Sequence, residues 1–162
     1  MTTSNQLAKN DKEWYTTLQQ RTDLNSLENI QTNFKRDNGT VTFLDADLVN
    51  PLETEMKYVR TYDSVTITYK QLDFECNNAT PFIASNPDIP ADYRPVAGPI
   101  VIGFAGIKST DILGDVTNST GPIVLLNTGV IQFFWSADPT DDFPLDESIV
   151  IEPYSCAFNV NI

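Results

Sequence analysis

An aromatic side chain followed closely by carboxylates is the most distinctive chemical grouping in this sequence. Trp135 is followed by Asp138, Asp141 and Asp142. An aromatic face packs against the C–H surface of a sugar ring, while carboxylates, amides and arginine bind the hydroxyl groups at the rim. The grouping therefore predicts a saccharide-binding site at this acidic loop. The alternative is that Trp135 is a core residue at the end of a strand, because Trp is largely buried in most proteins.

A second grouping of the same kind lies earlier in the chain, where Asp92, Tyr93 and Arg94 stand in a proline-marked loop. Tyr93 and Arg94 could bind a sugar ring and its hydroxyl groups. The alternative is that Tyr93 packs beneath its own loop while Arg94 pairs with a carboxylate. We therefore rank this second candidate site below the acidic loop.

The acidic loop also suggests a calcium site, because hard cations take several carboxylate and carbonyl oxygens as ligands. Asp138, Asp141 and Asp142 supply the carboxylates, but their spacing is not that of an EF-hand loop. The alternative is a solvated acidic loop. We expect no metal or other cofactor, with calcium at these three residues as the one candidate.

The composition excludes several classes of function. The chain contains no histidine, which removes the usual general base near neutral pH and the Ser-His-Asp and Cys-His nucleophiles. Residues 61–162 carry 13 acidic and only 3 basic side chains, so a nucleic-acid surface is not expected. We predict that the protein is not an enzyme. A glycan-degrading function remains an alternative, because paired carboxylates suffice for that reaction.

Hydropathy and cysteine spacing indicate a protein that neither enters a membrane nor depends on disulfides. No run approaches the roughly 18 apolar residues of a membrane span, and the first residues lack the pattern of a secretion signal. We expect a soluble protein without an export signal and with no membrane insertion. Cys76 and Cys156 lie 80 residues apart, match no close-spaced metal motif, and are predicted to be two buried thiols.

The elements that must position these residues are predicted to be mainly short β-strands. Residues 65–69 alternate apolar and polar side chains, and the alternation shifts parity near Lys70 and Gln71, which predicts a β-bulge. Residues 77–99 are rich in Pro and Asn and predict a long loop. Further strands are predicted at 100–105 (buried on both faces), in a hairpin across 127–129, at 148–151 and at 154–162. This spacing favours an antiparallel β-sandwich or barrel that resembles a jelly roll.

The N-terminal region has a different pattern. Residues 1–38 carry a sparse helical stripe and are predicted to form short helices that end at Asp37-Asn38-Gly39. Residues 39–60 are too short to bury themselves and predict a β-rich neck in which three chains wrap about one axis. The alternative is an edge hairpin of the following domain, residues 61–162. We therefore predict a helical stalk, a neck and a β-barrel head, assembled as a homotrimer.

One stretch of sequence resembles a known family. The loop Ile89-Pro90-Ala91-Asp92-Tyr93-Arg94-Pro95, with Gly103-Phe104-Ala105 and the hairpin at 126–133, resembles tail-tip heads of bacteriophages. The similarity is greatest to receptor-binding proteins of siphophages of Gram-positive bacteria, in particular the lower baseplate proteins of lactococcal phages. That resemblance implies a trimer with a helical shoulder, an interlaced neck and a β-barrel head that adsorbs to cell-surface saccharide.

The resemblance also implies partners and a location. The protein would be a virion component at the tail tip or baseplate, made in the host cytoplasm. Its N-terminal helices would attach it to an upper baseplate or tail-fibre protein, and its head would bind host cell-wall saccharide. The alternative function is that of a structural virion or appendage subunit whose head binds protein.

Overall fold

The structure of the protein is a computed structural model that describes residues 20, 34–44 and 46–161. The chain divides into a first unit, Met1–Lys35, and a second compact unit, Arg36–Ile162, which we call the β-unit. The helices predicted before Phe34 lie outside the described residues, apart from Gln20, so the helical stalk stays a prediction. No helix among the described residues is long and apolar enough to cross a membrane.

The described chain is built almost entirely from β-strands, as the alternation of apolar and polar residues predicts. One short 3₁₀ helix, η1 (Ala91–Tyr93), interrupts the loop between the fifth and sixth strands. The strands are β1 (Phe34–Phe43), β2 (Leu52–Thr61), β3 (Ser64–Tyr69), β4 (Leu72–Phe74), β5 (Phe82–Ala84), β6 (Ile100–Thr110), β7 (Val116–Leu125), β8 (Ile131–Phe134), β9 (Ser148–Ile151) and β10 (Tyr154–Asn159).

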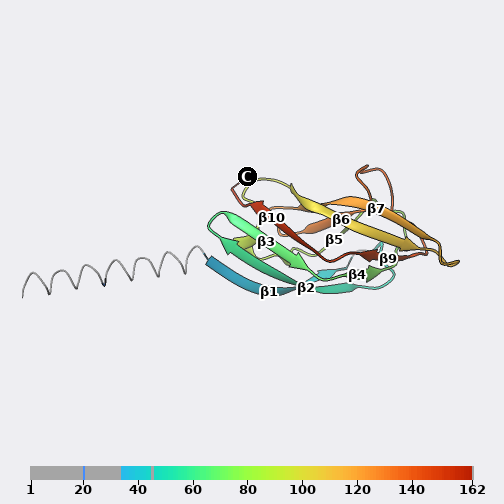
Figure 1. Cartoon of the computed structure of the whole chain (residues 1–162), viewed down its shortest axis with the longest axis horizontal. Helices are drawn as coiled ribbons and strands as arrows, with labels where there is room; N and C mark the ends of the chain where they lie inside the picture. Colours follow the sequence, from blue (N-terminus) through green and yellow to red (C-terminus); the bar gives the residue numbers. More distant parts are fainter. Residues whose placement is uncertain (1–19, 21–33, 45, 162) are drawn as a thin grey trace, which may run out of the picture. The chain divides into compact units, whose positions relative to one another are not determined.

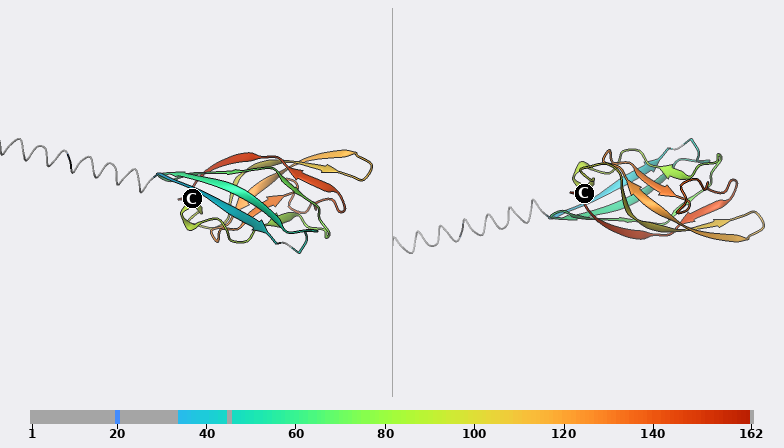
Figure 2. Two further views of the ribbon diagram at one scale, coloured as in Figure 1. Left: turned by 90° about the horizontal axis from the view of Figure 1, so that it is seen from below. Right: turned by 90° about the horizontal axis from the view of Figure 1, so that it is seen from above.

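These strands form two sheets, one with four strands in the order β1-β2-β3-β10 and one with six in the order β4-β9-β6-β7-β8-β5 (Figure 1). Every pairing among β2 to β10 is antiparallel. Figure 2 shows the ribbon formed by β6 and β7 extending beyond its neighbouring strands at one end of the β-unit. The predicted mainly-β, antiparallel sandwich is therefore confirmed.

The core lies between the two sheets. Phe133 of β8 is fully buried, and its ring lies 6.0 Å from Phe43 of β1 and 5.0 Å from Tyr69 of β3. Along β3 the side chains of Val65, Ile67 and Tyr69 are buried while the intervening threonines face outward. The period of two in the sequence thus becomes one apolar inner face on each sheet.

The chain changes sheets twice, and the first change corrects one prediction. Between β3 and β4 it leaves the four-stranded sheet for the six-stranded one at Lys70 and Gln71. The parity shift there is therefore a crossover between sheets and not a bulge within one strand, although Leu72, Phe74 and Cys76 are buried as expected. The second change, between β9 and β10, brings the C-terminal strand beside β3.

The strand predicted at 100–105 also differs from the expectation. β6 runs on to Thr110, and only one of its faces is buried, because Val101 and Phe104 are 57% and 54% exposed. An apolar run normally marks a strand buried on both faces, but here part of that run faces outward. The hairpin predicted across 127–129 is confirmed: the Leu126 amide donates to the Val130 carbonyl, and Gly129 adopts a φ of 92°.

The N-terminal boundaries predicted from the sequence also change. β1 begins at Phe34, so the helix predicted to end at Asp37-Asn38-Gly39 is wrong from Phe34 onward. Within one chain, β1 and β2 lie at one edge of the four-stranded sheet beside β3, the arrangement of the edge-hairpin alternative. A neck interlaced between three chains stays a prediction. Cys76 and Cys156 are free and buried, as predicted.

Candidate functional site

The predicted aromatic anchor of the acidic loop lies in the core. Trp135 is only 8% exposed, and its ring lies 5.5 Å from that of the buried Phe143. This placement matches the core alternative, so the Trp135 ring does not offer a face to a sugar in this conformation. Asp138, Asp141 and Asp142 are all exposed. The structure therefore separates the aromatic ring from the three carboxylates that the sequence grouped with it.

Hydrogen bonds within the acidic loop hold its carboxylates. Asp138 Oδ1 accepts from the Thr140 amide at 2.9 Å and from Thr140 Oγ1 at 2.7 Å, and these bonds hold the pKa of Asp138 below its ordinary value. Asp141 Oδ2 accepts from Ser136 Oγ at 2.7 Å. Among the described residues no three Asp, Glu or Cys side chains converge as metal ligands. Calcium binding by Asp138, Asp141 and Asp142 stays a prediction.

The side chains of Tyr93 and Arg94 both contact other parts of the β-unit. Tyr93 is 3% exposed and its ring stacks on Tyr58 at 5.1 Å, in agreement with the packed alternative. Arg94 Nε donates to the carbonyl of Ile89 at 2.5 Å, so the guanidinium binds backbone oxygen and not a carboxylate. Arg94 also lies against the hairpin turn, where a Cβ on Gly129 would come within 2.5 Å of Arg94 Nε. These contacts point to a structural role for both side chains.

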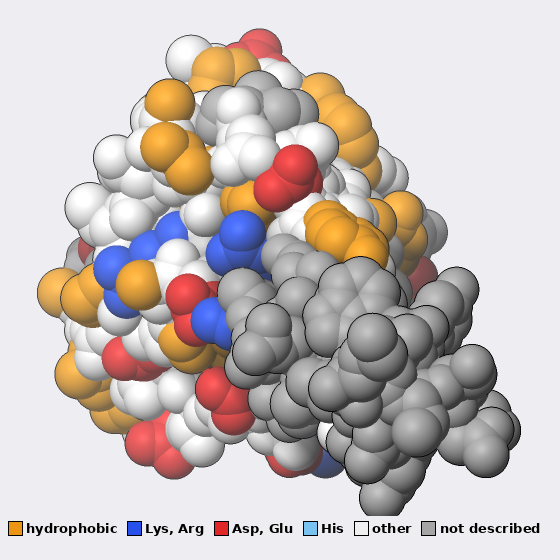
Figure 3. Space-filling view, turned by 90° about the vertical axis from the view of Figure 1, so that its left-hand side faces the viewer, with side chains coloured by type: hydrophobic (Ala, Val, Ile, Leu, Met, Phe, Trp, Pro, Cys, Tyr) orange, Lys and Arg blue, Asp and Glu red, His pale blue; other side chains and the backbone are white. Residues whose placement is uncertain are grey.

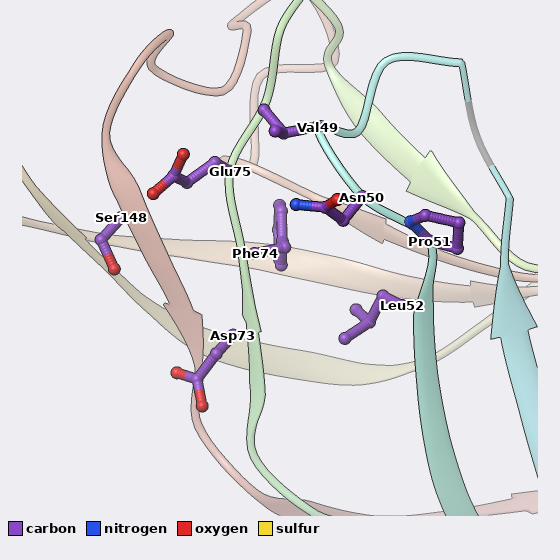
Figure 4. A pocket seen from close by; sticks show the side chains of 8 residues that line it. All are labelled: Val49, Asn50, Pro51, Leu52, Asp73, Phe74, Glu75 and Ser148. Atoms are coloured by element: carbon purple, nitrogen blue, oxygen red, sulfur yellow. The ribbon is translucent and has the colours of Figure 1, made fainter.

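A hollow of about 300 Å³, which we call the edge hollow, lies between the start of β2 and β4, an edge strand of the six-stranded sheet. Figure 4 shows the side chains of Asp73, Glu75, Asn50 and Ser148 around it, with Val49 and Pro51 on its apolar side. These carboxylates, the amide and the hydroxyl could bind sugar hydroxyl groups. Both Asp73 oxygens already accept from Gln71 at 3.1 Å, and the aromatic ring here, Phe74, is 8% exposed. The edge hollow therefore offers polar groups without an accessible aromatic face.

A second hollow, of about 210 Å³, lies on the outer face of the six-stranded sheet, and we call it the β6–β7 hollow. Gly106 lines it and pairs with Thr120 across the two strands, and Lys108 pairs with Asn118 further along the ribbon. Glu152 also lines it and forms an ion pair with Lys108, with Nζ 2.5 Å from Oε1. An amide, a hydroxyl, an acid and a base thus surround one small depression.

Gly106 is required for this arrangement. A Cβ at this position would come within 2.9 Å of Glu152 Oε2, so the missing side chain is what lets the carboxylate lie across the strand. The amide of Glu152 donates to the Gly106 carbonyl at 2.9 Å, which fixes the two residues side by side. The sequence signal for this site is the group of small residues Gly103, Ala105 and Gly106. A strand predicted to be buried on both faces left no place for a surface site there.

An exposed aromatic ring lies beside the β6–β7 hollow. Phe104 is 54% exposed and lies two residues before Gly106 on the outer face of β6. It pairs with Pro122 of β7. On the neighbouring strands Phe82 and Phe134 also pair, with ring centroids 5.1 Å apart. Both alternate with buried residues of their strands, so they lie on the same outer face. This sheet face therefore combines aromatic surface with the polar groups around Gly106.

A third hollow, of about 610 Å³, differs from the other two in its charge. It lies beside β1 and β2, and Arg36 and Lys57 are among its lining residues. Figure 3 shows Lys and Arg side chains gathering at the end of the β-unit where β1 begins. The full lining is Arg36, Asp37, Asn38, Lys57, Tyr58 and Val59, and we call it the basic hollow.

The fold is similar to those of solved viral attachment and fibre head proteins. No protein-family model matches the sequence, and no curated protein sequence matches it. The reovirus attachment protein sigma1, solved in complex with α-2,3-sialyllactose, is similar with a TM-score of 0.52 and 9% identity, covering 78% of this chain and 67% of that one. The fibre head of bovine atadenovirus type 4 is similar with a TM-score of 0.50 and 8% identity, covering 76% and 98%. At such identities the similarity shows a shared fold.

Proposed function

We propose that the protein is a receptor-binding protein of a virion and that its β-unit binds carbohydrate on the host surface. The observation that carries this proposal is the outer face of the six-stranded sheet, where the exposed Phe104 lies on the same face of β6 as Gly106 of the β6–β7 hollow. The fold shared with viral attachment heads supports it, one of which was solved with a sialylated sugar bound. A site for adhesion needs no catalytic group, which fits the proposed absence of an enzymatic function.

The sequence resemblance supports a narrower form of this proposal. In that form the virion is a tailed phage of Gram-positive bacteria, and the protein is a lower baseplate or tail-fibre tip subunit. Three chains form the adhesin, and residues 1–38 attach it to an upper baseplate or tail-fibre partner. Because a single sugar site binds weakly, three linked sites gain through effective concentration.

The geometry suggests how a sugar is held at the β6–β7 hollow. One face of the sugar ring packs on Phe104, which contributes about 0.5–1.5 kcal/mol beyond the area it buries, as for other aromatic contacts. The Asn118 amide donates to and accepts from hydroxyl groups, and the Thr120 hydroxyl does the same. Glu152 accepts from hydroxyl groups through the carboxylate oxygen above Gly106.

The test of the proposal measures mass and cell binding on the same sample of full-length protein. Light scattering is expected to give the mass of three 18.1 kDa chains, and labelled protein is expected to bind Gram-positive cells. Excess polysaccharide purified from the same cells is expected to compete for that binding. A monomer would overturn the trimer, while cell binding that polysaccharide fails to displace would overturn carbohydrate recognition.

One observation favours the second candidate, a structural subunit whose head binds protein. At the tip of the β6–β7 ribbon, Ile112 and Leu113 are 88% and 84% exposed. The turn that carries them is held by Asp111 Oδ1, which accepts from the amides of Leu113 and Asp115 at 2.8 and 2.9 Å. Rigidly held aliphatic side chains of this kind suit a protein contact. In that case I112S/L113S would abolish virion attachment and leave polysaccharide competition unchanged.

A further inference from the structure

We infer that the β6–β7 hollow binds a neutral pyranose and discriminates against sugars that carry a carboxylate or phosphate. This inference rests on the proposed carbohydrate-binding function and names the class of sugar. Three observations carry it: the pairing of the basic side chains in residues 61–162, the position of the Glu152 carboxylate, and the neighbouring Phe104 ring.

Every basic side chain in residues 61–162 already has a partner. Lys70 pairs with Glu55 at 3.0 Å, and Lys108 pairs with Glu152. Arg94 donates to the backbone carbonyls of Ile89 and Pro87. A negatively charged sugar on this part of the molecule would therefore have to share a cation with a group that already binds it.

At the hollow itself the group that already binds the cation, Lys108, is Glu152. Its Oε2 atom lies 2.9 Å from where a Cβ on Gly106 would be, so a carboxylate already occupies the edge of the binding surface. A second anion close to it would be repelled, and the 10 excess acidic residues of 61–162 add to the unfavourable field. A neutral hydroxyl, in contrast, donates a charge-assisted hydrogen bond to the same oxygen. The hollow is thus complementary to hydroxyl groups and not to anions.

The Phe104 ring fits the same ligand class. Its 54% exposure leaves part of the ring accessible to the C–H surface of a pyranose, which carries no charge. The Lys108 and Glu152 pair offers one donor and one acceptor side by side, a match for the alternating donor and acceptor capacity of neighbouring sugar hydroxyl groups. Charged sugars would instead favour the basic hollow, which includes Arg36 and Lys57.

The test uses the full-length protein on an array of oligosaccharides and cell-wall polysaccharides, each neutral glycan printed beside a sialylated or phosphorylated form. We expect binding to neutral members, with at least a tenfold weaker signal for their charged forms. F104A and E152A are expected to weaken this binding, F104A by about tenfold, whereas K57A, on the other sheet, keeps it. Circular dichroism of each variant verifies that the fold is retained.

The outcomes separate this inference from the proposed function. Binding of no glycan at all would overturn carbohydrate recognition itself. Preference for the charged member of a pair, or binding that K57A loses and F104A keeps, would overturn the neutral-sugar site and leave the proposed function standing. E152Q adds a further check, because an amide of the same shape keeps an acceptor: neutral sugar binding is expected to weaken less than in E152A, while discrimination against charged sugars falls.

Discussion

The two sheets share one core but present different outer faces. On the four-stranded sheet the outer positions carry hydroxyl and charged groups, such as the Thr68 hydroxyl bonded to that of Ser155 at 2.8 Å. On the six-stranded sheet the corresponding positions carry Phe104, Pro122 and the Phe82–Phe134 pair. Threonine and serine suffice for a solvated strand, so the fold does not require these aromatic rings. Their concentration on this face favours a binding role for it.

The largest effect is expected where the inner face of the six-stranded sheet is disturbed. Gly121 is buried, and a Cβ there would lie 1.7 Å from the Phe134 carbonyl oxygen, which belongs to the backbone and has little freedom to move. G121A is therefore expected to lower the free energy of unfolding by about 3 kcal/mol or more. Urea denaturation monitored by circular dichroism measures this free energy.

The matched control is G106A, on the outer face of the same sheet. Here the Cβ would meet the end of the flexible Glu152 side chain at 2.9 Å, and that side chain can rotate away. We expect a change in unfolding free energy within about 1 kcal/mol, with loss of sugar binding. Equal destabilisation by the two substitutions would contradict the division between a structural inner face and a functional outer face.

A second prediction compares two exposed aromatic residues, one at each sheet. F104A is expected to weaken affinity for the neutral glycan selected on the array about tenfold, because the ring contact with the sugar is lost. Y62A removes a side chain that is 62% exposed, between β2 and β3, and is expected to leave affinity unchanged. Isothermal titration calorimetry measures the affinity of both variants for the glycan. An equal loss of affinity in the two would refute a site confined to the six-stranded sheet.

The polar atoms on the inner faces predict a loss of stability in alkali. Burial raises the pKa of Cys156 to about 12 and also raises the pKa values of Tyr58 and Tyr69. Folding holds these groups neutral. Their contribution to the free energy of unfolding is therefore complete below their ordinary pKa values and is lost as the pH rises through the pKa values of the folded protein. Stability is therefore expected to fall between about pH 9 and pH 12.

Y69F tests the source of that loss. The Tyr69 hydroxyl is buried with no hydrogen-bond partner among the described residues, so its removal leaves no group unsatisfied. We expect this variant to be as stable as the parent at pH 7 and more stable in alkali, as measured by urea denaturation at pH 7 and pH 11. A parent protein whose stability stays flat to pH 11 would argue against protected inner-face hydroxyl and thiol groups.

The smallest effect is expected at the acidic loop. Asp138 and Asp141 are held by Thr140 and Ser136, and the described carboxylates do not converge. Calorimetry of calcium into metal-stripped protein is therefore expected to show no stoichiometric heat at millimolar concentrations. A saturable heat that D138N/D141N abolishes would restore the acidic loop as a second candidate site.

The sequence predicted the strands better than the site, for identifiable physical reasons. Alternation at 65–69 and the turn at 127–129 depend on local chemistry, and both are present in the structure. The crossover at Lys70 and Gln71 depends on which sheet the following strand joins, which a parity shift does not reveal. The same limit applies to β6, where an apolar run does not show which residues face outward.

The site residues depended even more on the packing of distant segments. Trp135 and Tyr93 have the residue types of a sugar platform, but contacts with Phe143 and Tyr58 place both rings in the interior. The β6–β7 hollow draws Gly106 and Glu152 from positions far apart in the sequence. Only the antiparallel pairing of β6 with β7 and β9 brings its parts together.

The most direct test of the account is to locate the bound neutral glycan on the full-length protein by amide chemical-shift mapping. We expect the shifts to concentrate at Gly106, Lys108, Asn118 and Thr120, with the ring protons of Phe104 also perturbed. Shifts centred on Lys57 and Val59 in the basic hollow, or on the acidic loop at 138–142, would contradict a binding site on the outer face of the six-stranded sheet.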